Sequence, residues 1–574
     1  MAEFLDSRNC FILLSMYDGK ERLLAGKNNM SGFHRFVPLV FLTSCIVCTS
    51  SLFAEGQKED RRPNIFFFFA DDWGRYASIY SNDAPNTTIH TPAMDRLARE
   101  GVCFTNAHIN SPSCTPCRSA LFSGQYFYRT GRGAVLRPAF WDSAIPTFPL
   151  LLEQSGYRIG FTYKAWSPGL NPDVPFGAER TRYNKAGSRF NQFSQNVTKM
   201  MAQGKNREEA KEELYVECLA NFEMFLADGE KSLEKKAKPF LYYFGPTNTH
   251  RAWTKGSGKA LWDMDPENLK GKLPKFLPDV PEVREDFCDY LGEVLALDAV
   301  LARFIKKLEE MGELDHTVIV VSGDHGIPGF PRGKCNLYNI GTEVSLFVRW
   351  GDKVKGERTV DDFINMMDIA PTLLEIAGLT PPDCMTGRSI LPLLMSDKSG
   401  QIDPTRDYVV TGRERHVETA RPDLTPYPQR AIRTKDFLYI RNFEPDRWPM
   451  GNPYHKEKND TLLEMTSKLA STHYTFPDMD GSPTKTWLVL NGEEPQWLRY
   501  WNFAFAKRPG EELYDLLKDR DYLVNVANDP AYDAVRKQLS ERLMKVLTTT
   551  NDPRVTGDGK TFERFPFAGE GTIE

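Results

Sequence analysis

The sequence predicts an α/β fold in which a large, mostly parallel sheet is sandwiched by helices and followed by a smaller C-terminal α+β domain. Two observations predict this fold class. From Pro63 onward, short apolar runs alternate with helical stretches, an order typical of a parallel sheet covered by helices. Residues 64–70 read NIFFFFA, the continuous apolar run of a strand buried on both faces.

The other elements follow the same alternation. Further strands are predicted at 157–163, 239–244, 317–322 and 344–350. Helices are predicted at 147–154, 208–228 and 287–310. The last of these gathers its leucines and valines on one face and ends near Gly312, as an amphipathic helix does.

The length of 574 residues exceeds what one ordinary core accommodates. A polar stretch at 396–400 predicts a domain boundary there. We therefore divide the chain into an N-terminal extension with a secretory signal (1–57), a main domain (58–400) and a smaller α+β domain (401–574). The last contains a predicted strand at 437–441 and a predicted helix at 531–547.

The N-terminal segment has the pattern of an export signal. An apolar run at 36–48 is followed by small residues up to Ala54. The run is interrupted by Pro, Ser and Thr and is shorter than a membrane-spanning helix. We expect export to the periplasm or the exterior without a membrane span, with lipoprotein processing at Cys45 as an open alternative.

Composition and charge narrow the function classes. Hydrophobic residues make up 41% of the chain and charged residues 26%, as in a globular enzyme. The net charge of -5 gives no general attraction for nucleic acid or anionic lipid. We expect no nucleic-acid partner, and a polyanionic substrate must be held by a local basic site.

Polar side chains follow several predicted strands. They are Asp71, Asp72, Lys164, His250, Asp324 and His325. Each alone is more often a turn, a cap or a surface residue, but ligands of parallel sheets gather at the carboxyl ends of the strands. Three carboxylates with little else nearby repel one another, so the set predicts a hard divalent cation, calcium rather than zinc.

The stretch SCTPCRSALFSG at 113–124 places Cys114 and Cys117 three residues apart. Seven cysteines remain beyond the signal, and no second C-x-x-C pair is among them to complete a zinc site. A thioredoxin-like redox pair is also disfavoured, because the motif does not follow the first strand. Cys117 is interpreted as a small buried group.

The motifs together resemble those of type I sulfatases of the alkaline phosphatase superfamily. The family signature Cys-x-Pro-x-Arg is matched by Cys114, Pro116 and Arg118, and the first metal motif by 70–72. The stretches 368–378 and 512–516 are also typical of the family. The resemblance runs from about Pro63 to Leu547.

The resemblance implies a nucleophile and a metal site. A formylglycine-generating enzyme would oxidise Cys114 to formylglycine (3-oxoalanine), whose hydrate is the nucleophile. Its position at a helix start would suit a bound sulfate. Asp71, Asp72, Asp324 and His325, with the oxygen of residue 114, would bind one Ca²⁺ per chain.

The remaining roles also follow from the resemblance. Arg118 would hold the nucleophile, and Lys334 would contact the sulfate. Lys164 matches the lysine of the family's Gly-Lys-x-His stretch, but Trp166 stands where the family has histidine. This departure leaves His250 as the acid toward the leaving group.

The stretch 326–342 and His250 are most similar to the heparan N-sulfatase (sulfamidase) branch. This implies a sulfuric ester or sulfamate hydrolase acting on a heparan-like sulfated glycan. Arg415 and His416 would hold a uronate or a second sulfate, with a solvated charged face as the alternative.

Two other functions stay open. A phosphodiesterase or phosphonate monoester hydrolase of the same superfamily shares the formylglycine and the Asp-His metal pair. A non-catalytic, exported glycan-binding protein would explain the missing histidine at position 166.

Overall fold

The computed structural model describes residues 61–170, 175–230, 238–453 and 461–567. The predicted secretory signal lies outside these residues. Contacts group residues 60–574 into one unit, so the boundary at residue 400 stays a prediction. Among the described residues, no helix is both long enough and apolar enough to cross a membrane.

The main sheet contains seven strands in the order β3-β4-β1-β5-β6-β2-β7. Their bounds are β1 Asn64–Ala70, β2 Val102–His108, β3 Arg158–Tyr163, β4 Phe240–Gly245, β5 Thr317–Gly323, β6 Leu346–Arg349 and β7 Arg358–Asn365. All neighbouring pairs are parallel except those of β6, which runs antiparallel to both β5 and β2. The predicted mostly parallel sheet is therefore confirmed.

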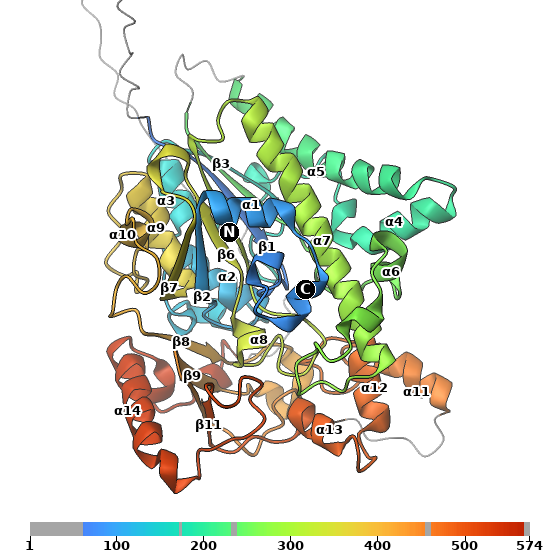
Figure 1. The fold of residues 1–574 in the computed structure, drawn as a ribbon. Helices are drawn as coiled ribbons and strands as arrows, with labels where there is room; N and C mark the ends of the chain where they lie inside the picture. Colours follow the sequence, from blue (N-terminus) through green and yellow to red (C-terminus); the bar gives the residue numbers. More distant parts are fainter. Residues whose placement is uncertain (1–60, 171–174, 231–237, 454–460, 568–574) are drawn as a thin grey trace, which may run out of the picture. The chain divides into compact units, whose positions relative to one another are not determined.

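The two faces of β1 enter two different cores. Phe66 and Phe68 pack into a cluster with α5 (Arg207–Glu230) and α7 (Pro281–Glu310). Phe67 and Phe69 pack into a second cluster with α2 (Cys114–Ser123), α3 (Phe148–Gln154) and α9 (Ile369–Ile376). Figure 1 shows these two groups of helices on opposite sides of the sheet. Because β1 is covered on both sides, its sequence is continuously apolar.

The predicted helices are present with bounds within two residues of the prediction, except that the helix predicted at 287–310 begins already at Pro281. The helices of the main layers are α1 Pro92–Glu100, α2 Cys114–Ser123, α3 Phe148–Gln154, α4 Phe193–Ala202, α5 Arg207–Glu230, α6 Ser257–Trp262, α7 Pro281–Glu310, α8 Asn339–Thr342, α9 Ile369–Ile376 and α10 Leu391–Leu394. Those that follow are α11 Leu462–Leu469, α12 Pro483–Asn491, α13 Leu498–Phe505, α14 Asp533–Thr549 and α15 Pro553–Thr556.

A smaller antiparallel sheet follows in the C-terminal part, with the order β11-β10-β9-β8. Its strands are β8 Tyr408–Arg413, β9 Gln429–Thr434, β10 Phe437–Asn442 and β11 Glu511–Asp515. Leu539, Leu543 and Leu547 of α14 share an apolar cluster with this sheet. The expected smaller α+β part is thus present.

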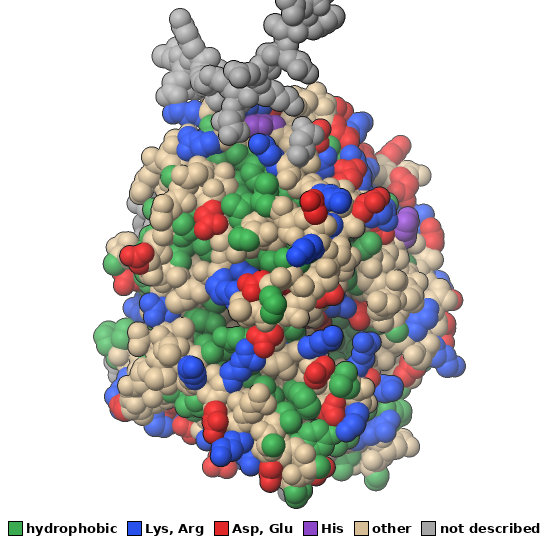
Figure 2. Space-filling view, turned by 60° about the vertical axis from the view of Figure 1, so that its left-hand side comes forward, with side chains coloured by type: hydrophobic (Ala, Val, Ile, Leu, Met, Phe, Trp, Pro, Cys, Tyr) green, Lys and Arg blue, Asp and Glu red, His purple; other side chains and the backbone are tan. Residues whose placement is uncertain are grey.

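The face of the molecule in Figure 2 carries basic and acidic side chains that are interspersed. This mixture agrees with the small net charge of -5. A polyanion would therefore find its cations in a local site rather than in a broad field on this face.

Candidate active site

The carboxyl ends of β1 and β5 bring the predicted metal ligands together. The strands pair in parallel with Ala70 opposite Gly323, so the residues that follow them lie side by side. Nε2 of His325 is 3.2 Å from Oδ1 of Asp72 and 3.4 Å from Oδ1 of Asp324. The amide of Asp72 donates to Oδ1 of Asp324 at 2.8 Å.

Cys114 is the first residue of α2 and faces this cluster. Its Sγ is 3.4 Å from Nε2 of His325, and the residue is 3% exposed. Burial, and after it the charge of Asp71, raises the pKa of the thiol to about 12. Because such a thiol stays protonated, unmodified Cys114 is a poor nucleophile. Cys117 is fully buried in the core, which confirms the expected small buried group.

Arg118 lies about one turn after Cys114, and its guanidinium joins both strand ends. Nε donates to Oδ2 of Asp324 at 2.9 Å, and Nη2 donates to Oδ1 of Asp71 at 3.2 Å. Nη1 donates to the hydroxyl of Tyr243 and to the backbone carbonyls of residues 164 and 165. The guanidinium is completely buried, so its planar array of donors is fixed.

Two lysines complete the basic set. Nζ of Lys164 is 2.7 and 2.8 Å from the two carboxylate oxygens of Asp71. Nζ of Lys334 is 3.1 Å from Oδ2 of Asp72. The carboxylates are thus each paired with a cation, which corrects the expectation that little else lies near them.

His250 stands at the edge of the same site. Its Nε2 is 4.0 Å from Oδ2 of Asp72, and its side chain is 37% exposed. Burial is the main cause that lowers its pKa, followed by the charge of Lys334. A partly exposed imidazole beside Lys164 and Lys334 can donate a proton to a leaving group.

Trp166 occupies the place of the family histidine. Its Nε1 donates to Oγ of Ser119 at 2.9 Å, and its ring packs edge-to-face on Trp141 with 5.7 Å between centroids. The indole N–H therefore binds Ser119, in the middle of α2, and not residue 114.

The donor set fits a hard cation. Ligand atoms of Asp71, Cys114, Asp324 and His325 all lie within 4.8 Å of one another. Oδ1 of Asp72 is buried and, within the described residues, accepts no hydrogen bond. Burial raises the pKa of Asp72 to about 7, because an ionised carboxylate there lacks sufficient compensation. Carboxylate oxygens with an oxygen from a modified residue 114 would suit Ca²⁺.

Arg415 and His416, predicted to bind substrate, are both buried. The guanidinium of Arg415 donates to the backbone carbonyls of Arg137, Leu424 and Phe567. The guanidinium of Arg415 therefore stabilises the packing of the segments around residues 137, 424 and 567. Nδ1 of His416 is 2.8 Å from Oγ of Ser113, next to the nucleophile position. The alternative of a solvated charged face is wrong, since both residues are at most 5% exposed.

Asp480 is a site residue that the sequence did not reveal. Its Oδ2 is 3.4 Å from Nζ of Lys334. It lies in a loop before α12, remote from any predicted strand end, and no motif of the resemblance includes it. Its only sequence signal is the pair of carboxylates in 476–482, FPDMDGS, which is too common a pattern to single out.

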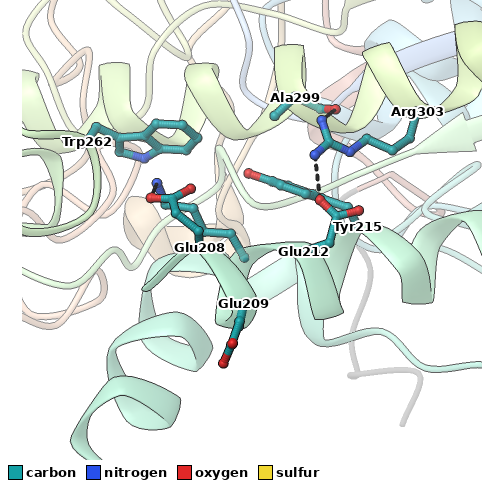
Figure 3. Close-up of a pocket in the computed structure, with 8 residues that line it drawn as sticks. Glu208, Glu209, Glu212, Tyr215, Trp262, Ala299 and Arg303 are labelled. Atoms are coloured by element: carbon teal, nitrogen blue, oxygen red, sulfur yellow. Dashed lines mark hydrogen bonds and ion pairs between the residues drawn. The ribbon is translucent and has the colours of Figure 1, made fainter. Parts of the chain in front are cut away.

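A separate surface pocket of about 500 Å³ lies among α5, α6 and α7 (Figure 3). Two ion pairs join residues that line it, Lys211 with Glu208 and Arg303 with Glu212. It shares no lining residue with the cluster around Cys114, and we assign it no function.

Comparison with known proteins adds a family context. A model described as "Sulfatase" matches residues 63–379, and one described as "N-sulphoglucosamine sulphohydrolase, C-terminal" matches residues 332–452. An ulvan-active sulfatase of Formosa agariphila is 26% identical over 549 residues, which cover 90% of this chain and 81% of that protein. The N-sulphoglucosamine sulphohydrolase of Homo sapiens is 25% identical over 543 residues, which cover 89% of this chain and 95% of that protein.

A solved structure, BT4656 in complex with D-glucosamine-2-N,6-O-disulfate, shares the fold with a TM-score of 0.51 at 18% identity. The match covers 86% of this chain and 99% of that chain.

Proposed function

The chain belongs to the sulfatase family, and from that premise we propose that it removes sulfate from a heparan-like sulfated glycan. It would do so as a sulfuric ester or sulfamate hydrolase, with formylglycine at position 114. The observation that carries the proposal is the convergence of Cys114, Asp71, Asp324 and His325 within 4.8 Å, together with the bond of Arg118 to both carboxylates.

The thiol of Cys114 stands in for a hydrated aldehyde in this proposal. Once formed, the hydrate would supply an oxygen nucleophile toward sulfur and a second hydroxyl through which the sulfate could be released, with water as the co-reactant of a net hydrolysis. Asp71, Asp324 and His325 would surround that residue, and Arg118 would hold the two carboxylates in place.

The basic side chains around the site would hold the sulfate charge. Lys164 and Lys334 point their ammonium groups at Asp71 and Asp72, and each has further donors for sulfate oxygens. Arg118 fixes the carboxylates from the buried side. A bound Ca²⁺ would supply charge stabilisation for the developing oxyanions.

His250 would protonate the leaving group. It is the partly exposed imidazole of the set, and its Nδ1 lies 2.6 Å from the carbonyl oxygen of Arg251. If Nδ1 carries a proton, this contact orients the ring with Nε2 toward the site.

Export and maturation complete the proposal. We propose that the protein is exported through its N-terminal signal and is matured by a formylglycine-generating enzyme. The division into a catalytic domain up to residue 400 and a smaller domain beyond it is part of the same proposal.

A second function is kept because Asp324 and His325 stand together at the end of β5. Phosphodiesterases and phosphonate monoester hydrolases of the superfamily share this pair, so their substrates belong in the test. A glycan-binding role without catalysis is supported only by Trp166 at the position of the family histidine.

The first test is the mass of tryptic peptide 100–118, from protein produced with and without a formylglycine-generating enzyme. We expect the aldehyde or its hydrate at residue 114 only with the enzyme. Sulfate release from N- and O-sulfated heparan fragments should follow the modified fraction, and Cys114→Ala should release none. Faster turnover of phosphate diesters than of every sulfate would favour the second function.

A further inference from the structure

Asp480 lies at the edge of the active site, and the hydrogen bonding of its carboxylate is incomplete. Its side chain is 13% exposed. Oδ2 is buried and, among the residues that the structure describes, accepts no hydrogen bond, although Nζ of Lys334 lies 3.4 Å away. Burial acts to raise the pKa of Asp480, but Lys334, His250 and His416 outweigh it and hold that pKa well below its usual range. An ionised carboxylate with free acceptor positions is costly to bury unless a ligand completes it.

The loop that carries Asp480 is held firmly. Two residues earlier, Asp478 accepts bonds from Arg413, Arg421 and the amide of Val417. Nζ of Lys485 donates to three carbonyl oxygens of the same loop, those of Thr472, Phe476 and Met479. On the other side, Oγ of Ser482 donates to the carbonyl of Gly329 at 2.6 Å. The position of Asp480 is therefore set by bonds that do not involve its own side chain.

The surroundings of Asp480 define what it can bind. Lys334 connects it to Asp72 at the metal cluster, so it lies one side chain away from that cluster. A carboxylate repels the sulfate group itself, and it can only accept hydrogen bonds. Its partner must therefore be a donor on the part of the substrate that leaves.

We propose that Asp480 determines specificity by accepting a hydrogen bond from the nitrogen that carries the sulfate in an N-sulfated amino sugar. This inference rests on the proposed sulfatase function. In a sulfamate the bridging nitrogen has an N–H to donate, whereas the bridging oxygen of a sulfate ester has none. When the S–N bond breaks, its electron pair stays on nitrogen, which takes a proton from His250 and, after a second proton from water, becomes an ammonium group. Asp480 stabilises that charge.

The test compares Asp480→Asn and Asp480→Ala with wild-type protein, all matured to formylglycine. The substrates are N-sulfoglucosamine and N-acetylglucosamine 6-O-sulfate. We expect kcat/KM for the N-sulfate to fall about 30-fold or more, because a buried acceptor loses its charge, and kcat/KM for the O-sulfate to change less than about 3-fold. Asp397→Asn, at an exposed carboxylate of the 396–400 loop, is the matched control and should leave both substrates unchanged.

A binding measurement provides an independent readout. Calorimetric titration of the matured protein with glucosamine and with glucose separates the ammonium group from the sugar hydroxyls. We expect Asp480→Asn to weaken glucosamine binding about 10-fold or more and to leave glucose binding unchanged.

The outcomes separate the two proposals. Equal losses on both sulfates would overturn the inference and would assign Asp480 to sugar hydroxyls or to positioning Lys334. Unchanged N-sulfate hydrolysis would overturn it as well. If matured wild-type protein hydrolyses only O-sulfates, the inference fails and the sulfatase function stands. If it hydrolyses no sulfate at all, the sulfatase function fails. The glucosamine titration then still tests whether Asp480 contacts the amino group of the sugar.

Discussion

Nε of Arg118 donates a hydrogen bond to Oδ2 of Asp324 across 2.9 Å, although 206 positions separate the two residues. Both side chains are completely buried. The bond ties the first turns of α2, which carry the proposed nucleophile Cys114, to the end of β5, which is followed by the proposed metal ligands Asp324 and His325. The same guanidinium therefore helps to set the position of the proposed nucleophile relative to the proposed metal ligands.

Arg118→Lys should break this coupling. Lysine keeps the charge but cannot span two carboxylates and three further acceptors in one plane. We expect sulfate hydrolysis to fall about 100-fold or more and the free energy of unfolding to fall by about 3 kcal/mol, as when a buried ion pair loses a partner. Denaturant unfolding and kcat/KM measure the two effects.

The variant keeps a trypsin site at residue 118, so the mass of peptide 100–118 reports on maturation. A loss of activity with unmodified cysteine would assign the effect to maturation instead. If Arg118→Lys had the same free energy of unfolding as wild type, this would contradict the structural role that we give to the guanidinium.

The sequence predicted most of the central fold because its strands are apolar throughout. The bounds of β1 and β5 are within one residue of the prediction, since both strands are buried on both faces. β2 and β7 were not predicted. They read VCFTNAH and RTVDDFIN, in which polar residues interrupt the apolar run. The antiparallel direction of β6 is set by tertiary pairing, and local sequence carries no signal for it.

The convergence of Asp71, Cys114, Asp324 and His325 was predictable because strand ends and a motif mark these residues. Asp480 and the buried bonds of Arg415 were not, because both depend on loops that meet only in the folded chain. The charge of Arg415 suggested substrate binding, but the carbonyl groups around it come from residues 137, 424 and 567. Such long-range contacts leave no periodic pattern in the sequence.

Calcium should stabilise the protein through the cluster at the strand ends. A ligand that binds only the folded state at 100 times its Kd adds about 2.7 kcal/mol. We expect chelation to lower the Tm of matured protein and Ca²⁺ to restore it, with Mg²⁺ less effective because it demands a tighter octahedral site. Asp324→Asn should abolish the Ca²⁺-dependent shift. A Tm that ignores both chelator and calcium would contradict the metal assignment.

Trp166→His restores the family residue but should not raise activity. The indole N–H of Trp166 bonds to Ser119 and the ring packs on Trp141, so the variant loses packing worth about 1–3 kcal/mol. Trp166→Phe, which keeps a ring but not the N–H, should cost about 1 kcal/mol. Thermal unfolding and kcat measure both variants. A kcat raised tenfold in Trp166→His would show that the missing histidine limits the reaction.

Asp478→Asn and Asp480→Asn should have different effects on the free energy of unfolding, although the two carboxylates lie in the same loop. Asp478 is fully bonded to Arg413, Arg421 and an amide, and Arg421 helps to lower its pKa to about 2 against the opposing effect of burial. Asp478→Asn should therefore cost about 3–5 kcal/mol. Asp480→Asn removes the ion pair with Lys334 at 3.4 Å but leaves that lysine its bond to Asp72, so it should cost less, about 1–2 kcal/mol. Equal destabilisation in chemical denaturation would mean that Asp480 is structural.

Asp298 links the stability of the protein to pH, away from the candidate active site. It lies on α7, is 4% exposed, and accepts from the amides of Ala93 and Met94 at the start of α1. Burial raises its pKa to about 6, above the value of about 3.9 expected when unfolded. Between pH 4 and 6 the unfolded chain has released this proton and the folded chain has not, so the contribution to stability falls with rising pH. The loss is nearly complete by about pH 7 and amounts to at most about 3 kcal/mol.

Asp298→Asn should remove this dependence, because the amide does not ionise. The difference in the free energy of unfolding between variant and wild type should shift in favour of the variant from pH 4 to pH 6 and stay constant above pH 7. Urea unfolding across this range measures the difference directly, and titration of all other groups cancels between the two proteins. A shift in favour of wild type would mean that the two amides and the start of α1 hold the carboxylate ionised against its burial.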